Sequence, residues 1–268
     1  MNVAVFGLGE AGSRFAADLA ASGATVRGFD PAPVPTPPGV ERCDTPVDAV
    51  RDAALVLALT AAVDAPGALA QALHAIPTGA LYADCATGSG RMKQELGSTA
   101  AAAGVAFVDV ALMAVVPGNG LRTPALVSGP GAPRYVALLA PFGIDLQAVG
   151  DEPGLAATRK LLRSVFMKGL AAVVIEALRA GEAAGQADWL WGNLVDEVTA
   201  AGGPLLSRLV RGTGPHAVRR LHEMEASMAL LDELGVEPVM TRSTVESLRR
   251  IAAGGRMPAI PLVPGEPR

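Results

Sequence analysis

The sequence predicts an α/β protein in which an N-terminal doubly wound parallel sheet precedes an all-helical C-terminal domain. Two observations carry this prediction. Short apolar runs alternate with helical patterns over residues 1–150, which is typical of parallel strands covered by helices on both faces. Beyond Gly150 the strand-like runs stop, and a helical pattern without proline extends from Gly154 to Ala184.

The first strand is expected over 3–6, and it leads into a glycine-rich turn and a helix over 13–21. Gly7 allows the tight turn, Gly9 lets backbone approach a phosphate, and Gly12 lets the helix pack on the strand. The N-terminus of the helix would face the negative charge. This order predicts a Rossmann-type dinucleotide site, with a purely structural turn as the alternative. The expected cofactor contacts are Gly7, Leu8, Gly9, Glu10, Ala11 and Gly12.

The remaining elements follow from the same patterns. Further strands are expected over 25–29, 55–59, 80–83, 105–110, 124–128 and 144–149. A loop is expected over 31–39, because five of its nine residues are proline. After the long interdomain helix, shorter helices are expected over 187–201, 215–234 and 242–253. The predicted domains are a dinucleotide-binding domain (1–152), a helical substrate and dimerisation domain (153–256) and a proline-rich tail (257–268).

Asp30 closes the second strand, eighteen residues after Gly12. A carboxylate there accepts hydrogen bonds from the adenosine ribose hydroxyls and repels a 2′-phosphate, so the predicted cofactor is NAD(P) with NAD favoured. The alternative is a turn cap ahead of Pro31. Arg27 and Arg42 could still reach a 2′-phosphate, so NADP stays an alternative cofactor.

Polar residues also follow later strands. Leu59 and Thr60 follow the strand at 55–59, and Thr87 follows the strand at 80–83. Because ligands of open α/β sheets bind at the carboxyl ends of strands, these three residues are expected at the cofactor site. A capped strand-to-helix turn is the structural alternative for each.

Composition narrows the function classes. The net charge is −4, and nothing in the composition suggests the basic face that nucleic acids require, so no nucleic-acid partner is expected. Cys43 and Cys85 lie far apart without metal-type spacing, so we expect free thiols in the cytoplasm and no metal site. Neither a signal sequence nor a membrane span is expected.

Lys160, Ser164 and Lys168 recur every four residues and therefore share one stripe of the long helix. Their neighbours are apolar, and a polar stripe on a mostly buried helix needs a reason because unpaired buried charge is costly. A lysine in such a stripe can act as a general acid/base. The alternative is a solvated row of basic residues.

The order of these motifs resembles that of the β-hydroxyacid dehydrogenases, a family that includes 3-hydroxyisobutyrate, tartronate-semialdehyde and 6-phosphogluconate dehydrogenases. The resemblance covers residues 1–185. Residues 219–225 and 234–238 are similar to a less-characterised branch of phosphogluconate-dehydrogenase-like NAD(P)-dependent oxidoreductases. The motifs are Gly7-x-Gly9-x-x-Gly12, Asp84 with Thr87, Asp109 with Pro117-Gly118, and Gly154 with Lys160 and Ser164.

The resemblance implies an enzyme that transfers a hydride between the nicotinamide and a CH–OH group, with Lys160 as general acid/base. The chain departs from the family at the substrate positions: Ser164 stands where asparagine is usual, and Met113 stands where a serine usually grips the substrate. Lys168 would supply a replacement cation. Asn119 and Arg122 are further substrate candidates, although an arginine at this place is also consistent with a surface position.

The resemblance also implies a small-molecule substrate and a homodimer that buries the long helix. Two other functions stay open. One is an imine reductase on a similar scaffold, in which the acid/base lysine is typically absent. The other is a non-catalytic dinucleotide-binding protein, which the departures at Met113 and Ser164 favour.

Overall fold

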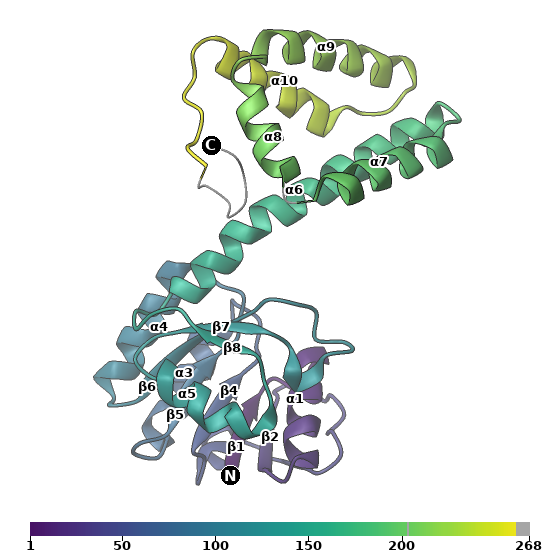
Figure 1. Ribbon diagram of the computed structural model, residues 1–268. Coiled ribbons are helices and arrows are strands. Elements are labelled where there is room, and N and C mark those ends of the chain that lie inside the picture. Colours follow the sequence, from purple (N-terminus) through teal and green to yellow (C-terminus); the bar gives the residue numbers. More distant parts are fainter. Residues whose placement is uncertain (203, 261–268) are drawn as a thin grey trace. The chain divides into compact units, whose positions relative to one another are not determined.

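The computed structural model describes residues 1–202 and 204–260 (Figure 1). The chain forms two compact units, Met1–Ser164 and Val165–Arg268. The long helix α6 (Leu155–Ala183) begins in the first unit and continues into the second. Of the proline-rich tail expected over 257–268, residues 261–268 lie outside the described residues.

The first unit is built on an eight-stranded sheet with the order β3-β2-β1-β4-β5-β6-β7-β8. Its central strands are parallel and in close register, so that Val3 of β1 lies between Val26 of β2 and Leu55 of β4. The expected doubly wound α/β architecture is confirmed. The strands are β1 (Asn2–Phe6), β2 (Thr25–Phe29), β3 (Val40–Arg42), β4 (Leu55–Ala58), β5 (Leu81–Asp84), β6 (Ala106–Leu112), β7 (Ala125–Ser128) and β8 (Leu146–Ala148).

The sheet is not wholly parallel, and here the prediction of a parallel sheet is wrong for its last two strands, because β7 and β8 run opposite to the other six. β7 runs antiparallel to β6, with Asp109 opposite Ser128. The connection between the two strands holds only a short 3₁₀ turn (Gly120–Arg122) and no crossover helix. A parallel neighbour needs such a crossover, so the chain returns antiparallel instead.

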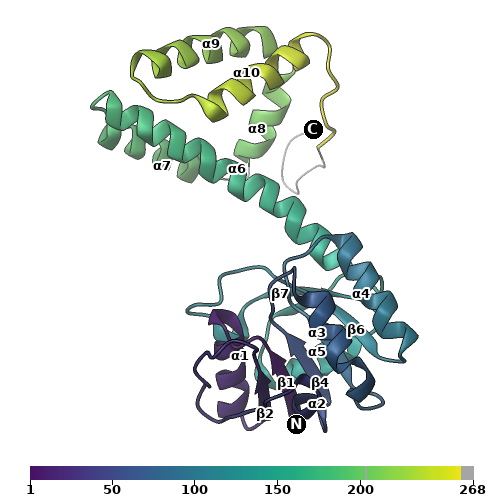
Figure 2. The same ribbon diagram turned by 180° about the vertical axis from the view of Figure 1, so that it is seen from behind.

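Helices cover both faces of the sheet. On one face lie α1 (Glu10–Ala21) and α5 (Ala132–Leu139), and on the other lie α2 (Pro46–Val50), α3 (Ala65–Ala72) and α4 (Gly90–Ala102) (Figure 2). Alternation along β1 separates the two cores, because Val3 and Val5 face the first layer while Ala4 and Phe6 face the second. Two 3₁₀ turns extend α3 and α5, at Leu73–Ala75 and Ala140–Phe142.

The second unit contains only helices among its described residues. They are the distal part of α6, followed by α7 (Ala187–Ala201), α8 (Pro204–Thr213), α9 (Ala217–Glu233) and α10 (Val239–Ala252). Gly181 brings α7 close to α6, since a Cβ there would lie 2.9 Å from the Leu190 side chain. In the described part of the chain, no helix is long and apolar enough to cross a membrane.

Candidate functional site

The glycine-rich turn brings three segments into close contact. Gly7 has a φ of +82°, and a Cβ there would lie 2.5 Å from the Leu59 carbonyl oxygen. A Cβ on Gly12 would lie 1.8 Å from the Gly7 carbonyl oxygen, so only glycine lets α1 pack this closely. α1 begins at Glu10 with Gly9 at its N-cap. Within the described part of the chain, no side chain caps this helix start and no atom would lie within 4 Å of a Cβ on Gly9. An uncapped helix start beside open space is what phosphate binding requires.

A pocket of about 480 Å³ lies beside this turn. Asp30, Leu59 and Thr60 line it together with Gly7 and Gly9. Thr60 Oγ1 is buried and has no hydrogen-bond partner among residues 1–202 and 204–260, which leaves a hydroxyl for a ligand to satisfy. The residues present therefore fit a dinucleotide. The other predicted residues of the turn do not line the pocket: Leu8, Glu10, Ala11 and Gly12.

Both carboxylate oxygens of Asp30 accept hydrogen bonds from backbone amides. Its Oδ2 accepts a hydrogen bond from Leu8 N at 2.7 Å, and its Oδ1 accepts one from Ala32 N at 2.8 Å. The carboxylate thus caps the turn ahead of Pro31 and also faces the pocket, so the two interpretations of Asp30 do not exclude each other.

The two arginines that the sequence left open for a 2′-phosphate are engaged elsewhere. Arg42 donates to the carbonyl oxygens of Asp30, Ala32 and Val34, at 2.7–2.8 Å, and so ties down the proline-rich loop. Arg27 pairs with Glu41 and Asp52, which raises the pKa of its guanidinium, mainly through the hydrogen bond to Glu41.

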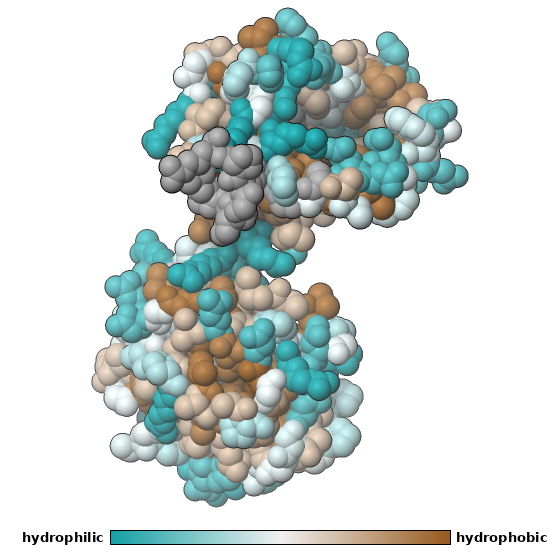
Figure 3. All heavy atoms as spheres, viewed as in Figure 1, coloured by the Kyte–Doolittle hydropathy of each residue, from teal (hydrophilic) through white to brown (hydrophobic). Residues whose placement is uncertain are grey.

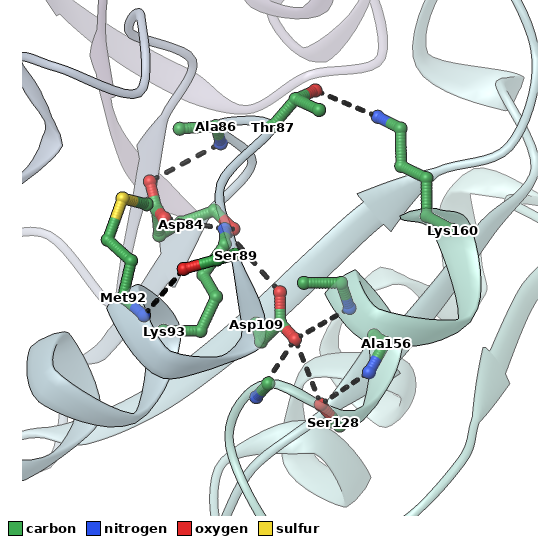
Figure 4. Close-up of polar contacts among 12 residues, drawn as sticks. Asp84, Ala86, Thr87, Ser89, Met92, Lys93, Asp109, Ser128, Ala156 and Lys160 are labelled. Carbon is green, nitrogen blue, oxygen red and sulfur yellow. Dashed lines mark hydrogen bonds and ion pairs between the residues drawn. The ribbon is translucent and has the colours of Figure 1, made fainter. Parts of the chain in front are cut away.

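Lys160 and Thr87 meet at the carboxyl end of the sheet. The Lys160 Nζ donates a hydrogen bond to Thr87 Oγ1 at 3.0 Å (Figure 4). Thr87 lies in the loop between β5 and α4, and Lys160 lies in the second turn of α6. Both line one small crevice, whose other walls include Ala86, Val110 and Ala157. The structure thus brings together two residues that the sequence placed in separate motifs.

A buried charge cluster lies next to this pair. Lys93, Asp84 and Asp109 are each 0% exposed. The Lys93 Nζ donates to Asp84 Oδ2 at 2.6 Å and to the Asp84 carbonyl oxygen at 2.8 Å. Burial raises the pKa of the Asp84 carboxyl, and the Lys93 ammonium offsets this only in part. Burial also raises the pKa of the Cys85 thiol to about 12, so Cys85 is not a thiolate at neutral pH.

Asp109 fixes the start of α6. Its Oδ2 accepts hydrogen bonds from Gly154 N at 3.1 Å, Ala157 N at 3.0 Å and Ser128 Oγ at 3.2 Å. Its Oδ1 accepts no hydrogen bond in the described part of the chain and lies 3.4 Å from Lys93 Nζ. A carboxylate at a helix N-terminus satisfies free amides and complements the helix dipole.

The predicted substrate residues are spread over several places. Ser164 is half-buried near the end of the first unit, and Lys168 belongs to the second unit. The carbonyl oxygen of Met113 accepts a hydrogen bond from Arg163 Nη1 at 3.4 Å, so the Met113 loop touches α6 near the crevice. Arg163 was not predicted, because its exposed position one turn from Lys160 gives no motif.

Asn119 and Arg122 are not brought together with Lys160. They line a different hollow of about 620 Å³ on the first unit, beside Arg14 and Asp18 of α1. The Leu121 amide donates to Asp18 Oδ2 at 2.7 Å, which docks this loop on the third turn of α1. Their assignment as substrate residues remains a prediction.

The glycine turn, the lined pocket and the mostly parallel sheet define the first unit as a dinucleotide-binding α/β domain. Residues 2–118 match the NAD binding domain of 6-phosphogluconate dehydrogenase, and residues 182–251 match a domain of unknown function, DUF1932. The chain thus combines an NAD-binding domain of the 6-phosphogluconate dehydrogenase type with a DUF1932 domain, in agreement with the resemblance noted in its sequence.

Solved structures of similar fold cover most of the chain. A conserved hypothetical protein from Sinorhizobium meliloti 1021 is 28% identical with a TM-score of 0.61, covering 92% of this chain and 87% of that one. A reductive aminase from Aspergillus terreus in complex with NADPH4, cyclohexanone and allyl amine is 21% identical with a TM-score of 0.80, covering 94% of each chain. An imine reductase from Myxococcus stipitatus in complex with NADP+ is 20% identical with a TM-score of 0.80, covering 95% of each. The last two similarities show the shared fold.

One curated relative also matches. An uncharacterized 28.5 kDa protein from Methanothermus fervidus is 26% identical over 145 residues, which is 54% of this chain and 56% of that protein. The chain therefore matches about half the length of this relative.

Proposed function

We propose that this protein interconverts a CH–OH group and a carbonyl in a small hydroxy acid, using NAD(P) as cofactor and Lys160 as general acid/base. The observation that carries the proposal is the hydrogen bond from Lys160 Nζ to Thr87 Oγ1 at 3.0 Å. This hydrogen bond holds the Lys160 amine at the carboxyl end of the sheet, where the glycine turn also lies. Ligands of this fold bind at that end of the sheet.

The cofactor would be held by the glycine turn, Asp30, Leu59 and Thr60. When bound, the nicotinamide supplies a hydride acceptor or donor. Asp30 favours NAD because its fixed carboxylate can accept from ribose hydroxyls and repels a 2′-phosphate. The engagement of Arg27 and Arg42 with other groups supports the same preference.

Lys160 acts on the substrate oxygen. In the oxidation direction its amine takes the hydroxyl proton as the carbon becomes a carbonyl, and in reduction its ammonium returns that proton. Thr87 holds the Lys160 Nζ from one side. Ser164, Met113 and Lys168 would contact the substrate, and the thioether of Met113 favours an apolar group where the family usually has a serine.

The test is a comparison of Lys160→Met with Arg159→Met. Arg159 is exposed and adjacent on the same helix, so it is a matched control. Cofactor turnover is measured against a panel of hydroxy acids, aldehydes and imines, and NADH binding is measured by fluorescence. We expect Lys160→Met to lose about 10²- to 10⁴-fold in kcat, the usual contribution of a general acid/base, while the dissociation constant of NADH is unchanged.

Undiminished turnover in Lys160→Met would remove the assignment of Lys160. A chain that binds NADH but turns over no member of the panel would instead support a non-catalytic dinucleotide-binding protein. Arg159→Met is expected to behave as the wild type in both measurements.

Imine reduction is the second candidate. The observation that favours it is the similarity of fold to the reductive aminase and the imine reductase, each over at least 94% of the chain. The presence of Lys160 favours the hydroxy acid instead. Higher kcat/KM for imines than for carbonyl acids in the same panel would reverse this preference.

The proposal also includes a homodimer, which the exposed apolar side chains of the second unit support. Apolar side chains gather at the surface of the second unit (Figure 3), and Trp189 is 66% exposed. On α6 the exposed stripe is Phe166, Leu170 and Val173, and on α7 it is Trp191, Val195 and Val198. Exposed apolar side chains that gather on neighbouring helices mark an interaction surface, so we infer a homodimer that buries these stripes.

A further inference from the structure

Lys93 is a fully buried ammonium that the proposed reaction does not use. It lies between two buried carboxylates, 2.6 Å from Asp84 Oδ2 and 3.4 Å from Asp109 Oδ1. Such a cluster is weak evidence for stability, because apolar side chains of similar volume usually stabilise a core as well or better. Its presence under the candidate site therefore calls for another role.

The two carboxylates belong to the two segments that form the candidate site. Asp84 ends β5, and its Oδ1 accepts a hydrogen bond from Ala86 N at 3.3 Å, one residue before Thr87. Asp109 Oδ2 accepts from Ala157 N at 3.0 Å, three residues before Lys160. Lys93 thus joins the loop that carries one partner of the site to the helix that carries the other (Figure 4).

The helix that carries Lys93 is itself fixed against α6. A Cβ on Gly154 would lie 2.4 Å from the Gly90 carbonyl oxygen, and a Cβ on Gly90 would lie 2.5 Å from Thr158 Oγ1. The N-terminal turns of α4 and α6 are therefore in backbone contact. Because the packing there is tight, a change of the Lys93 side chain is expected to displace one helix start relative to the other.

We propose that Lys93 is a positioning residue: by holding Asp84 and Asp109 together it sets the distance between Thr87 Oγ1 and Lys160 Nζ. The inference rests on the proposed role of Lys160. A displacement of a catalytic group by about 1 Å can lower the rate about 100-fold. The cluster of Lys93, Asp84 and Asp109 would therefore control turnover without contacting substrate or cofactor.

The test is the double variant Lys93→Met with Asp84→Asn, compared with Lys93→Met alone. The single variant leaves two buried carboxylates without a cation, and the second substitution removes one of these charges. Melting temperature, NADH dissociation constant, kcat and KM are measured for each. Hydrogen exchange by mass spectrometry is measured for peptides that cover 84–90 and 154–164. Arg91→Met is the control, because Arg91 is exposed on the same helix and pairs with Glu95.

We expect the double variant to recover the melting temperature and to bind NADH as the wild type does. Its kcat should nevertheless fall about 100-fold, with a smaller change in KM, and exchange should be faster in both peptides. Wild-type kcat together with wild-type exchange would overturn the inference. A double variant that does not fold would assign the cluster to folding alone and also overturn it. Retained turnover in Lys160→Met would contradict the proposed role of Lys160. The exchange data would then still show whether Lys93 orders the segments 84–90 and 154–164.

Discussion

The Asp30 carboxylate is fixed by two backbone amides before any cofactor binds, since Leu8 N and Ala32 N both donate to it. A rigid carboxylate discriminates between ligands more sharply than a mobile one, because it cannot turn away from a 2′-phosphate. Asn in its place would keep the shape of the side chain while it removes the charge.

For Asp30→Asn we expect the preference for NADH over NADPH to narrow by about tenfold, the effect of about 1.4 kcal/mol. The measurement is the ratio of the two dissociation constants by fluorescence titration. Asp44→Asn, an exposed residue outside the pocket, should leave the ratio unchanged. A wild-type chain that binds NADPH more tightly than NADH would contradict the assignment of Asp30 before any variant is made.

At the residue scale, strand and helix patterns predicted the position of the glycine turn after β1 and of Lys160 on the long helix, and the structure has both there. The role of Lys160 was inferred from the family resemblance and stays a prediction. Lys93 was missed, because a lysine on a helix is usually solvated. Two signals were present: Lys93 occupies the apolar stripe of α4 with Leu96, Gly97 and Ala100, and Asp84 pairs in register with Asp109 on neighbouring buried strands. Two adjacent buried carboxylates require a cation.

At the scale of elements, the start of α10 depends on a residue from another helix. Among the described residues no local side chain caps α10, and Glu176 of α6 accepts hydrogen bonds from Met240 N, Thr241 N and Thr241 Oγ1 at 2.6–2.8 Å. Burial alone would raise the pKa of this carboxyl, but the hydrogen bonds from Thr241 and Met240 outweigh it and lower the pKa below its ordinary value of 4.5.

Glu176→Gln should destabilise the second unit by about 1–2 kcal/mol, since an amide donor replaces one acceptor at the helix start. A lowered pKa in the folded state means that this stabilisation is complete above pH 4.5 and is lost as the pH falls through the folded pKa. Urea unfolding at several pH values checks both statements. Glu182→Gln, on an exposed position of the same helix, is the control. A difference from the wild type that grows on acidification would contradict the sign.

Two features of the secondary structure were not predicted from the sequence: the helix α8 and the direction of strand β7. α8 was not expected, because Gly202 and Pro204 suggest a loop, yet proline is favoured at the first position of a helix. The antiparallel direction of β7 was not expected either, since the apolar run at 124–128 has the same pattern in both directions. Direction depends on the connection, which a strand pattern does not contain.

At the scale of the whole molecule, the exposed apolar stripes of the second unit support the homodimer that we propose. The spacing 166, 170, 173 on α6 repeats as 191, 195, 198 on α7, which is the i, i+4, i+7 spacing of a helix face that packs against another helix. The sequence predicted that α6 would be covered by other helices, and in the single chain many of its apolar side chains are instead exposed. A partner of the same sequence carries the same stripes, so a two-fold symmetric interface matches them on both sides.

We therefore expect the wild type to sediment as a dimer in analytical ultracentrifugation, and Val173→Glu with Val198→Glu to sediment as a folded monomer. Each glutamate would be buried among apolar side chains, and every loss of about 1.4 kcal/mol raises the dissociation constant tenfold. Val47→Glu, at a partly exposed position on α2 of the first unit, should remain dimeric and serves as the control. Circular dichroism distinguishes dissociation from unfolding, because the monomer must keep its helix content. A wild type that sediments as a monomer at micromolar concentration would show that these stripes cover some other surface.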